Sequence, residues 1–134
     1  MKLTKEDKEL IEKAKEIIVK SKPVKLIDTG ETGAALITSK GNFFVGVSLG
    51  HYCGLGSCAE YQAIGNMVSN GEKEIKKIVA VGERGEIKPP CGVCREMIIL
   101  TCKKNKNTEV IISKTKKVKL KELLPYGWKG SIEK

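Results

Sequence analysis

The sequence predicts an α/β domain in which helices cover both faces of a mixed β-sheet, a three-layer α/β/α sandwich. Three observations predict this class: an amphipathic pattern opens the chain, a hairpin signal follows it, and apolar β-branched runs then alternate with helical periodicity. A hairpin makes neighbouring strands antiparallel, whereas strands that alternate with helices tend to pair in parallel, so the sheet is expected to be mixed. The length of 134 residues is that of one domain, 1–134.

The first predicted element is an amphipathic helix. Thr4 is followed three residues later by Asp7, which is the spacing of a capping box. Pro23 marks the end of the pattern, because proline cannot continue a helix. Between these signals, apolar residues recur at helical spacing at Leu10, Ile11, Ala14, Ile17 and Ile18.

The next two predicted elements are the strands of a hairpin, at residues 34–39 and 43–47. Both runs are apolar, and Lys40-Gly41-Asn42 between them supplies a turn. The glycine-rich residues 49–57 then form a loop. The rest of the chain is expected to contain a helix over 58–68, a strand over 75–81, a helix over 91–102, a strand over 109–113 and a short helical turn over 120–124.

The charge of the chain is carried mostly by scattered lysines, with 25 Lys and Arg against 16 Asp and Glu giving +9. Proteins that read nucleic acid more often cluster arginine and interleave aromatic side chains, whereas this chain has one Trp, three Tyr and two Phe. We therefore expect no nucleic-acid partner. The sequence shows no secretory leader and no apolar run of membrane length, so a cytoplasmic location without a membrane partner is expected.

Cysteine carries the chemistry of this sequence. Cys58-Ala59-Glu60 and Pro90-Cys91-Gly92-Val93-Cys94 together supply three thiolates and one carboxylate. Catalytic zinc takes three protein ligands and keeps a fourth position open. The five cysteines, in a chain without an export signal, favour metal chemistry over a disulfide framework. One Zn²⁺ per chain is expected, bound by Cys58, Cys91 and Cys94.

Two further residues belong to the predicted centre. Glu60 follows Cys58 by two positions, where it reaches the metal's open position and would act as general base and then general acid. Arg95 directly follows Cys94 and would offset the negative charge of three thiolates. The alternative is a closed structural site with Cys53 or Cys102 as fourth ligand. Its spacing is less favourable, because such sites are normally built from two Cys-x-x-Cys pairs.

These motifs resemble the cytidine deaminase superfamily and, within it, are most similar to those of the blasticidin S deaminases. The likeness covers about residues 33–128 and rests on Gly33-Ala34-Ala35-Leu36, Phe44-Val45-Gly46-Val47, Cys58-Ala59-Glu60, Pro90-Cys91-Gly92-Val93-Cys94-Arg95 and the tail Glu122-Leu123-Leu124-Pro125-Tyr126-Gly127-Trp128. The resemblance implies a sheet of five strands between helices, a zinc site with a glutamate proton carrier, and a homotetramer whose active sites borrow residues from neighbouring subunits.

Substrate recognition departs from the ordinary cytidine deaminase pattern. Where that family has Asn and Glu to grip the ribose, this chain has Ser48 and Gly50, and residues 27–32 lack the aromatic that stacks on the pyrimidine. Without these partners, cytidine itself is not expected to be the best substrate. The residues expected to contact the substrate are Ser48, Ala59, Tyr126, Trp128 and the loop residue His51.

The sequence thus predicts a zinc-dependent deaminase that acts on a cytosine ring, favours a blasticidin S-type nucleoside analogue and releases ammonia. Three alternatives stay open. The first is a cytidine or deoxycytidine deaminase of pyrimidine salvage, and the second is a deaminase of nucleic-acid bases. The third is a non-catalytic protein of the same fold that binds a nucleoside or zinc.

Overall fold

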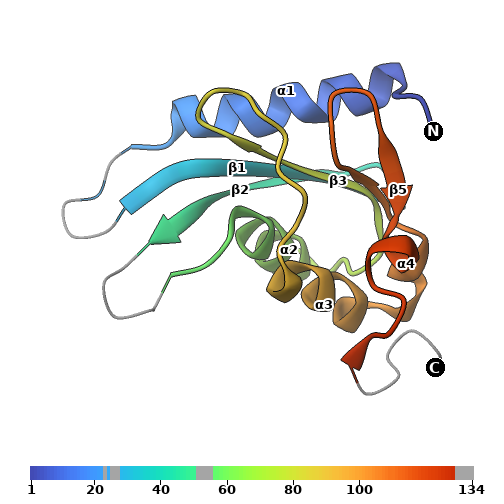
Figure 1. Cartoon of the computed structure of the whole chain (residues 1–134). Coiled ribbons are helices and arrows are strands. Elements are labelled where there is room, and N and C mark those ends of the chain that lie inside the picture. The colour runs from blue at the N-terminus through green and yellow to red at the C-terminus, as the bar shows by residue number, and fades with distance from the viewer. Residues whose placement is uncertain (23, 25–27, 51–55, 129–134) are drawn as a thin grey trace.

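A five-stranded mixed sheet forms the centre of the computed structural model, which describes residues 1–22, 24, 28–50 and 56–128 (Figure 1). The strand order is β2-β1-β3-β4-β5, and only the β3–β4 pair is parallel. The mixed sheet of five strands confirms the prediction. The strand bounds are β1 Asp28–Thr38, β2 Phe43–Gly50, β3 Ile75–Gly82, β4 Glu109–Ile111 and β5 Lys117–Lys119.

Helices cover both faces of this sheet, as the three-layer prediction requires. Helix α1 (Lys5–Lys20) lies on one face, and α2 (Ala59–Ser69) and α3 (Gly92–Thr101) lie on the other (Figure 1). The short helix α4 (Leu120–Leu123) and the 3₁₀ helix η1 (Lys103–Asn107) complete the fold. Alternate residues of β1 point to opposite faces of the sheet. Ala35 and Ile37 pack in the hydrophobic cluster with α1, whereas Ala34 and Leu36 pack in the cluster with α2 and α3.

Helix α1 begins at the predicted capping box. The Thr4 N–H donates to Asp7 Oδ2 at 2.7 Å, and the Asp7 N–H donates back to Thr4 Oγ1 at 3.3 Å. The helix ends at Lys20, so its last residue precedes Pro23, which lies outside the described residues.

The sheet differs from the prediction in strand bounds and in one additional strand. Strand β2 extends to Gly50, into residues predicted as a loop, and β4 ends at Ile111 rather than at residue 113. Strand β1 begins at Asp28 rather than at residue 34, with a register shift between Thr29 and Gly33 that the residue pattern does not signal. Strand β5 was not predicted at all, because its sequence is Lys117-Val118-Lys119. The buried residue of β5 is Lys117 rather than an apolar residue. The sequence therefore lacks the alternation of apolar and polar residues that predicts a strand.

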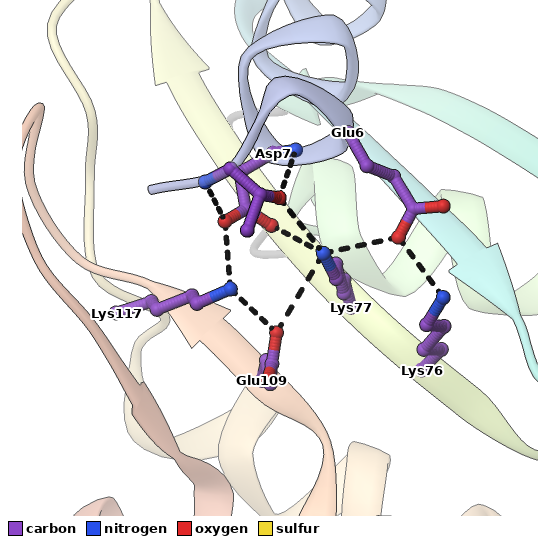
Figure 2. A network of polar contacts seen from close by, with 7 residues as sticks. Glu6, Asp7, Lys76, Lys77, Glu109 and Lys117 are labelled. Carbon is purple, nitrogen blue, oxygen red and sulfur yellow. Dashed lines mark hydrogen bonds and ion pairs between the residues drawn. The ribbon is translucent and has the colours of Figure 1, made fainter. Parts of the chain in front are cut away.

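That buried lysine belongs to an ion-pair network that ties α1 to three strands (Figure 2). Asp7 is fully buried. Its Oδ1 forms an ion pair with Lys77 Nζ and its Oδ2 forms one with Lys117 Nζ, each at 2.7 Å. Glu109 Oε1 lies 2.8 Å from Lys117 Nζ, and Glu6 Oε1 lies 3.0 Å from Lys77 Nζ. Burial alone would raise the pKa of Asp7, but the hydrogen bonds from Lys117 and Lys77 outweigh it and lower that pKa to about 2.

The sheet also brings two helix starts together. Cys58 is the N-cap of α2 and Cys91 is the N-cap of α3, and both helices pack on the same face of the sheet. Side chains at the N-caps and first turns of the two helices can therefore share one site. Among the helices of the described residues, none is long and apolar enough to cross a membrane.

We predict that Asp7→Asn lowers the free energy of unfolding by about 3 kcal/mol, because it leaves two buried ammonium groups short of a negative partner. Urea denaturation at pH 7 measures this change. Since the folded pKa of Asp7 is about 2 and its usual value is 3.8, its contribution is complete above pH 3.8 and is lost as the pH falls through 2. The stability difference between wild type and variant should therefore shrink over that interval.

The matched control is Glu6→Gln, which removes a carboxylate of the same network whose side chain is 34% exposed. This variant should lose less than about 1 kcal/mol, as exposed ion pairs do. If Asp7→Asn unfolds at the same urea concentration as wild type, the network does not hold α1 on the sheet.

Candidate active site and metal centre

Three cysteine sulfurs meet where helices α2 and α3 begin. The Sγ atoms of Cys58 and Cys91 are 3.5 Å apart, those of Cys91 and Cys94 are 3.7 Å apart, and all three lie within 4.8 Å of one another. Neither N-cap cysteine uses its side chain to cap its helix. The sulfurs are therefore free to face one another, and the structure brings together the three cysteines that the sequence singled out.

The spacing of these sulfurs fits a tetrahedral zinc ion. With Zn–S bonds of about 2.3 Å, two sulfurs in a tetrahedron lie about 3.8 Å apart, close to the separations in this cluster. Burial raises the pKa of the Cys94 thiol far above its usual range, and the nearby Glu60 charge raises it further. A bound cation would reverse this effect, because a metal ion deprotonates a thiol that coordinates it.

Glu60 lies beside the sulfurs in a small cavity of about 160 Å³. Its side chain sits in the first turn of α2 and the residue is 6% exposed. Burial raises the pKa of Glu60, and the Cys94 thiol and the Lys88 ammonium partly offset that rise. The cavity is lined by Thr32, Cys58, Ala59, Glu60, Ala80, Lys88, Pro89 and Cys91.

Arg95 forms its side-chain hydrogen bonds with two backbone carbonyl groups. Its Nε donates to the carbonyl oxygen of Pro90 at 2.8 Å, and its Nη1 donates to that of Leu123 at 3.1 Å. These bonds attach Arg95 to backbone next to the metal centre, and the expectation that it offsets the negative charge of the thiolates stays a prediction. Because Pro90 directly precedes Cys91, Arg95 fixes the segment that carries this cysteine and links it to the end of α4.

Ser48, an expected substrate contact, forms a hydrogen bond with a residue of the cavity wall. Its Oγ accepts a hydrogen bond from the Thr32 N–H at 3.0 Å, and Thr32 Oγ1 in turn accepts one from Lys88 Nζ at 3.3 Å. Ser48 is not among the residues that line the cavity, whereas Thr32 and Lys88 are. Sequence reasoning missed Lys88. The only signal for it is its position three residues before Cys91, which any lysine-rich chain can produce by chance.

The other predicted contacts lie in three different settings. Ala59 lines the cavity and is fully buried. Tyr126 and Trp128 are 93% and 60% exposed and are absent from the lining of the cavity. The Trp128 N–H donates to Glu96 Oε1 at 3.0 Å. His51 lies outside the described residues, so the structure does not place it.

Cys102 and Cys53 are the two cysteines that could supply a fourth ligand in a closed site. Cys102 is the C-cap of α3 and does not belong to the group of three sulfurs. Cys53 lies outside the described residues. Over the ranges that the structure describes, the cluster is thus an open set of three thiols.

Comparison with protein families supports this interpretation of the site. The model of the cytidine and deoxycytidylate deaminase zinc-binding region matches residues 4–110, which include all three clustered cysteines and Glu60.

Two relatives match this chain in sequence over part of their length. Blasticidin-S deaminase of Bacillus cereus is 41% identical over 75 residues, covering 49% of this chain and 54% of the relative. Cytidine deaminase of Halalkalibacterium halodurans is 32% identical over 73 residues, covering 54% of this chain and 55% of the relative. The match therefore spans about half the length of each relative.

Solved structures resemble this chain over nearly its whole length. Cytidine deaminase from Burkholderia pseudomallei superimposes with a TM-score of 0.73 at 29% identity, covering 94% of this chain and 100% of that one. Cytidine deaminase from Mycobacterium leprae gives a TM-score of 0.76 at 22% identity, covering 92% of this chain and 100% of that one, which shows a shared fold.

We predict that Cys91→Ser lowers the zinc content of the purified protein at least tenfold from one ion per chain, since removal of one of three ligands leaves too few donors. Elemental analysis of the protein after dialysis measures this loss. Cys102→Ser is the matched control, because it changes a cysteine outside the cluster, and it should retain the full zinc content. Equal zinc in both variants would contradict the assignment of the cluster as the metal centre.

Proposed function

Because the chain belongs to the cytidine and deoxycytidylate deaminase family through its zinc-binding region, we propose that it hydrolyses the exocyclic amine of a cytosine ring and releases ammonia. Residues 1–134 would act as one deaminase domain. The observation that carries the proposal is the position of the buried Glu60 in the same small cavity as the Cys58 and Cys91 sulfurs. A carboxylate beside a three-thiolate centre is the arrangement that hydrolytic deamination of a nucleobase requires.

In the proposed reaction, Cys58, Cys91 and Cys94 hold the zinc ion and Glu60 moves the protons. When bound, zinc supplies a Lewis acid that makes water nucleophilic at neutral pH. Glu60 takes one proton from the water that attacks ring carbon C4 and delivers it to ring nitrogen N3. A second proton passes through the same carboxyl group to the leaving nitrogen, so that cytosine and water become uracil and ammonia. The raised pKa of Glu60 suits a group that must hold and release a proton.

Ala59 would help to hold the ring through its backbone. It is the first residue of α2, and the N–H groups of a first helical turn have no acceptor within the helix. Since Ala59 lines the cavity, its N–H can donate to a carbonyl oxygen of the substrate. Arg95 would support the metal centre from outside, through its bond to the Pro90 carbonyl.

Blasticidin S is the substrate we propose first. The 41% identity with the Bacillus cereus blasticidin-S deaminase supports it, as do Ser48 and Gly50 in place of a ribose clamp. Cytidine or deoxycytidine is the second candidate, supported by the 32% identity with the Halalkalibacterium cytidine deaminase. The location we propose is the cytoplasm, because clustered cysteines that form no disulfide are typical of a reducing compartment.

We further propose a homotetramer. Helices α2 and α3 expose apolar side chains at Tyr61, Val68, Val93 and Leu100, which would be covered by a neighbouring subunit. The exposed Tyr126 and Trp128 would then contact the substrate of a neighbour rather than that of their own chain.

The catalytic assignment predicts that Glu60→Gln lowers kcat about a thousandfold or more while zinc content is retained, since general acid–base catalysis contributes on this scale. Ammonia release is measured with blasticidin S, cytidine, deoxycytidine, cytosine and adenosine as substrates. Glu12→Gln, an exposed glutamate on α1, is the control and should leave turnover unchanged. Binding of cytosine compounds without turnover by wild type would favour a non-catalytic binding protein.

The assembly proposal predicts that the wild-type protein has the mass of four chains by light scattering and that Leu100→Glu dissociates it. Val19→Glu is the control, because it places the same charge on the exposed end of α1. A monomeric wild-type protein with full activity would contradict both the tetramer and a substrate role for Tyr126 across the interface.

A further inference from the structure

Lys88 is a cation in the wall of the catalytic cavity. The buried residues Ala59, Glu60 and Ala80 form the inner part of this cavity, whereas Lys88 and Pro89 are exposed residues at its solvent side. A cytosine ring whose amine approaches Glu60 would leave its N1 substituent near the exposed side. Lys88 therefore borders the space that the sugar part of a nucleoside would occupy.

The backbone holds Lys88 firmly in this place. Its N–H donates to the Ala80 carbonyl oxygen at 2.9 Å, and the neighbouring Ile87 forms a β-bridge with Val81. The side chain passes closely over Gly82, since a Cβ at that position would lie 2.9 Å from Lys88 Cε. The backbone of Lys88 is thus hydrogen-bonded to β3, and its side chain packs against Gly82. A side chain held in this way has a better defined position than one on an unsupported loop.

The Lys88 ammonium is only partly satisfied by the protein. An ammonium group has three N–H donors, and one of them is used by Thr32 Oγ1 at 3.3 Å. Among the described residues, no carboxylate forms an ion pair with Lys88 within 4.0 Å, although the Glu86 carboxylate lies next to the Lys88 stem at Gly82 and, with Glu31 and Glu83, lines a neighbouring pocket that Lys88 also borders. Lys88 thus differs from Lys77 and Lys117, whose charges are paired with Asp7, Glu6 and Glu109.

Hydrogen bonds that involve Ser48 and Thr32 position the side chain of Lys88. Ser48 fixes the Thr32 backbone N–H, and Thr32 presents its hydroxyl to Lys88. The chain thus has a Ser48–Thr32–Lys88 series of hydrogen bonds that ends in a cation at the cavity, at the side where a sugar would lie.

We infer that Lys88 determines substrate specificity by binding an oxyanion on the sugar part of a cytosine nucleoside. This inference rests on the proposed deaminase function and names the substrate class of the same site. The oxyanion can be a sugar carboxylate, as in blasticidin S, or a phosphate, as in a cytidine monophosphate. Both accept charge-assisted hydrogen bonds from an ammonium group.

The test compares substrate pairs that differ mainly in this anionic group. One pair is blasticidin S and its methyl ester, and the other is cytidine 5′-monophosphate and cytidine. The wild-type enzyme should favour the anionic member of at least one pair in kcat/KM, mainly through KM. Lys88→Met should reduce that preference about tenfold, which is the scale of one hydrogen bond to a charged group. Lys88→Arg should restore most of it.

Arg84→Met is the matched control, because Arg84 is the other cation of the neighbouring pocket and lies outside the catalytic cavity. It should leave the preference unchanged, whereas a general effect of net charge would lower it in both variants. If Lys88 only holds Thr32 in place, Lys88→Met will change both members of each pair equally, and that result would overturn the inference.

The pair that shows the preference identifies the source of the oxyanion, a carboxylate or a phosphate. Turnover by wild type without preference in either pair would overturn the inference and leave the deaminase proposal intact. A second readout covers the case without turnover, in which binding of the same four compounds to the Glu60→Gln variant is measured by calorimetry. Binding of none of them would overturn both the inference and the proposed function.

Discussion

The structure depends on one geometric constraint, which is that three sulfurs from two separate helices must meet within bonding distance of a single ion. Cys58 ends the approach to α2, and Cys91 and Cys94 begin α3, so neither segment can form the site alone. The sheet satisfies the constraint because both helices pack on one face of it, with their first turns side by side. Zinc would in turn add its binding free energy to the stability of this packing.

Lysine has two opposite roles in this structure, one for two buried side chains and one for an exposed side chain. At the end of the sheet near the start of β3, Lys77 and Lys117 are paired with Asp7 and so stabilise the docking of α1. Near the other end of β3, Lys88 has no such partner among the described residues and faces the catalytic cavity. The same residue type therefore serves the fold where it is neutralised and substrate binding where it is not.

Most of the fold and the metal ligands could be predicted from local patterns, and the failures have physical causes. The capping box at Thr4 and the Cys-x-x-Cys pair at Cys91 each depend on a few neighbouring residues, and Cys58 stands in the short motif Cys58-Ala59-Glu60, so all of them can be recognised in the sequence. Strand β5 is not, because its inward Lys117 is stabilised by Asp7 from the far end of the chain. Arg95 was assigned from its proximity to Cys94 and Ser48 from the family resemblance, whereas the hydrogen bonds of both residues are set by tertiary packing.

The central claim is that three cysteines bind zinc and leave its fourth position open for chemistry. X-ray absorption at the zinc edge of the zinc-loaded protein tests it most directly, because the spectrum separates sulfur from lighter ligands. The account predicts three sulfurs at about 2.3 Å and one oxygen or nitrogen at about 2.0–2.2 Å. Four sulfurs at a single distance would contradict it, since a closed thiolate site has no position at which water can react.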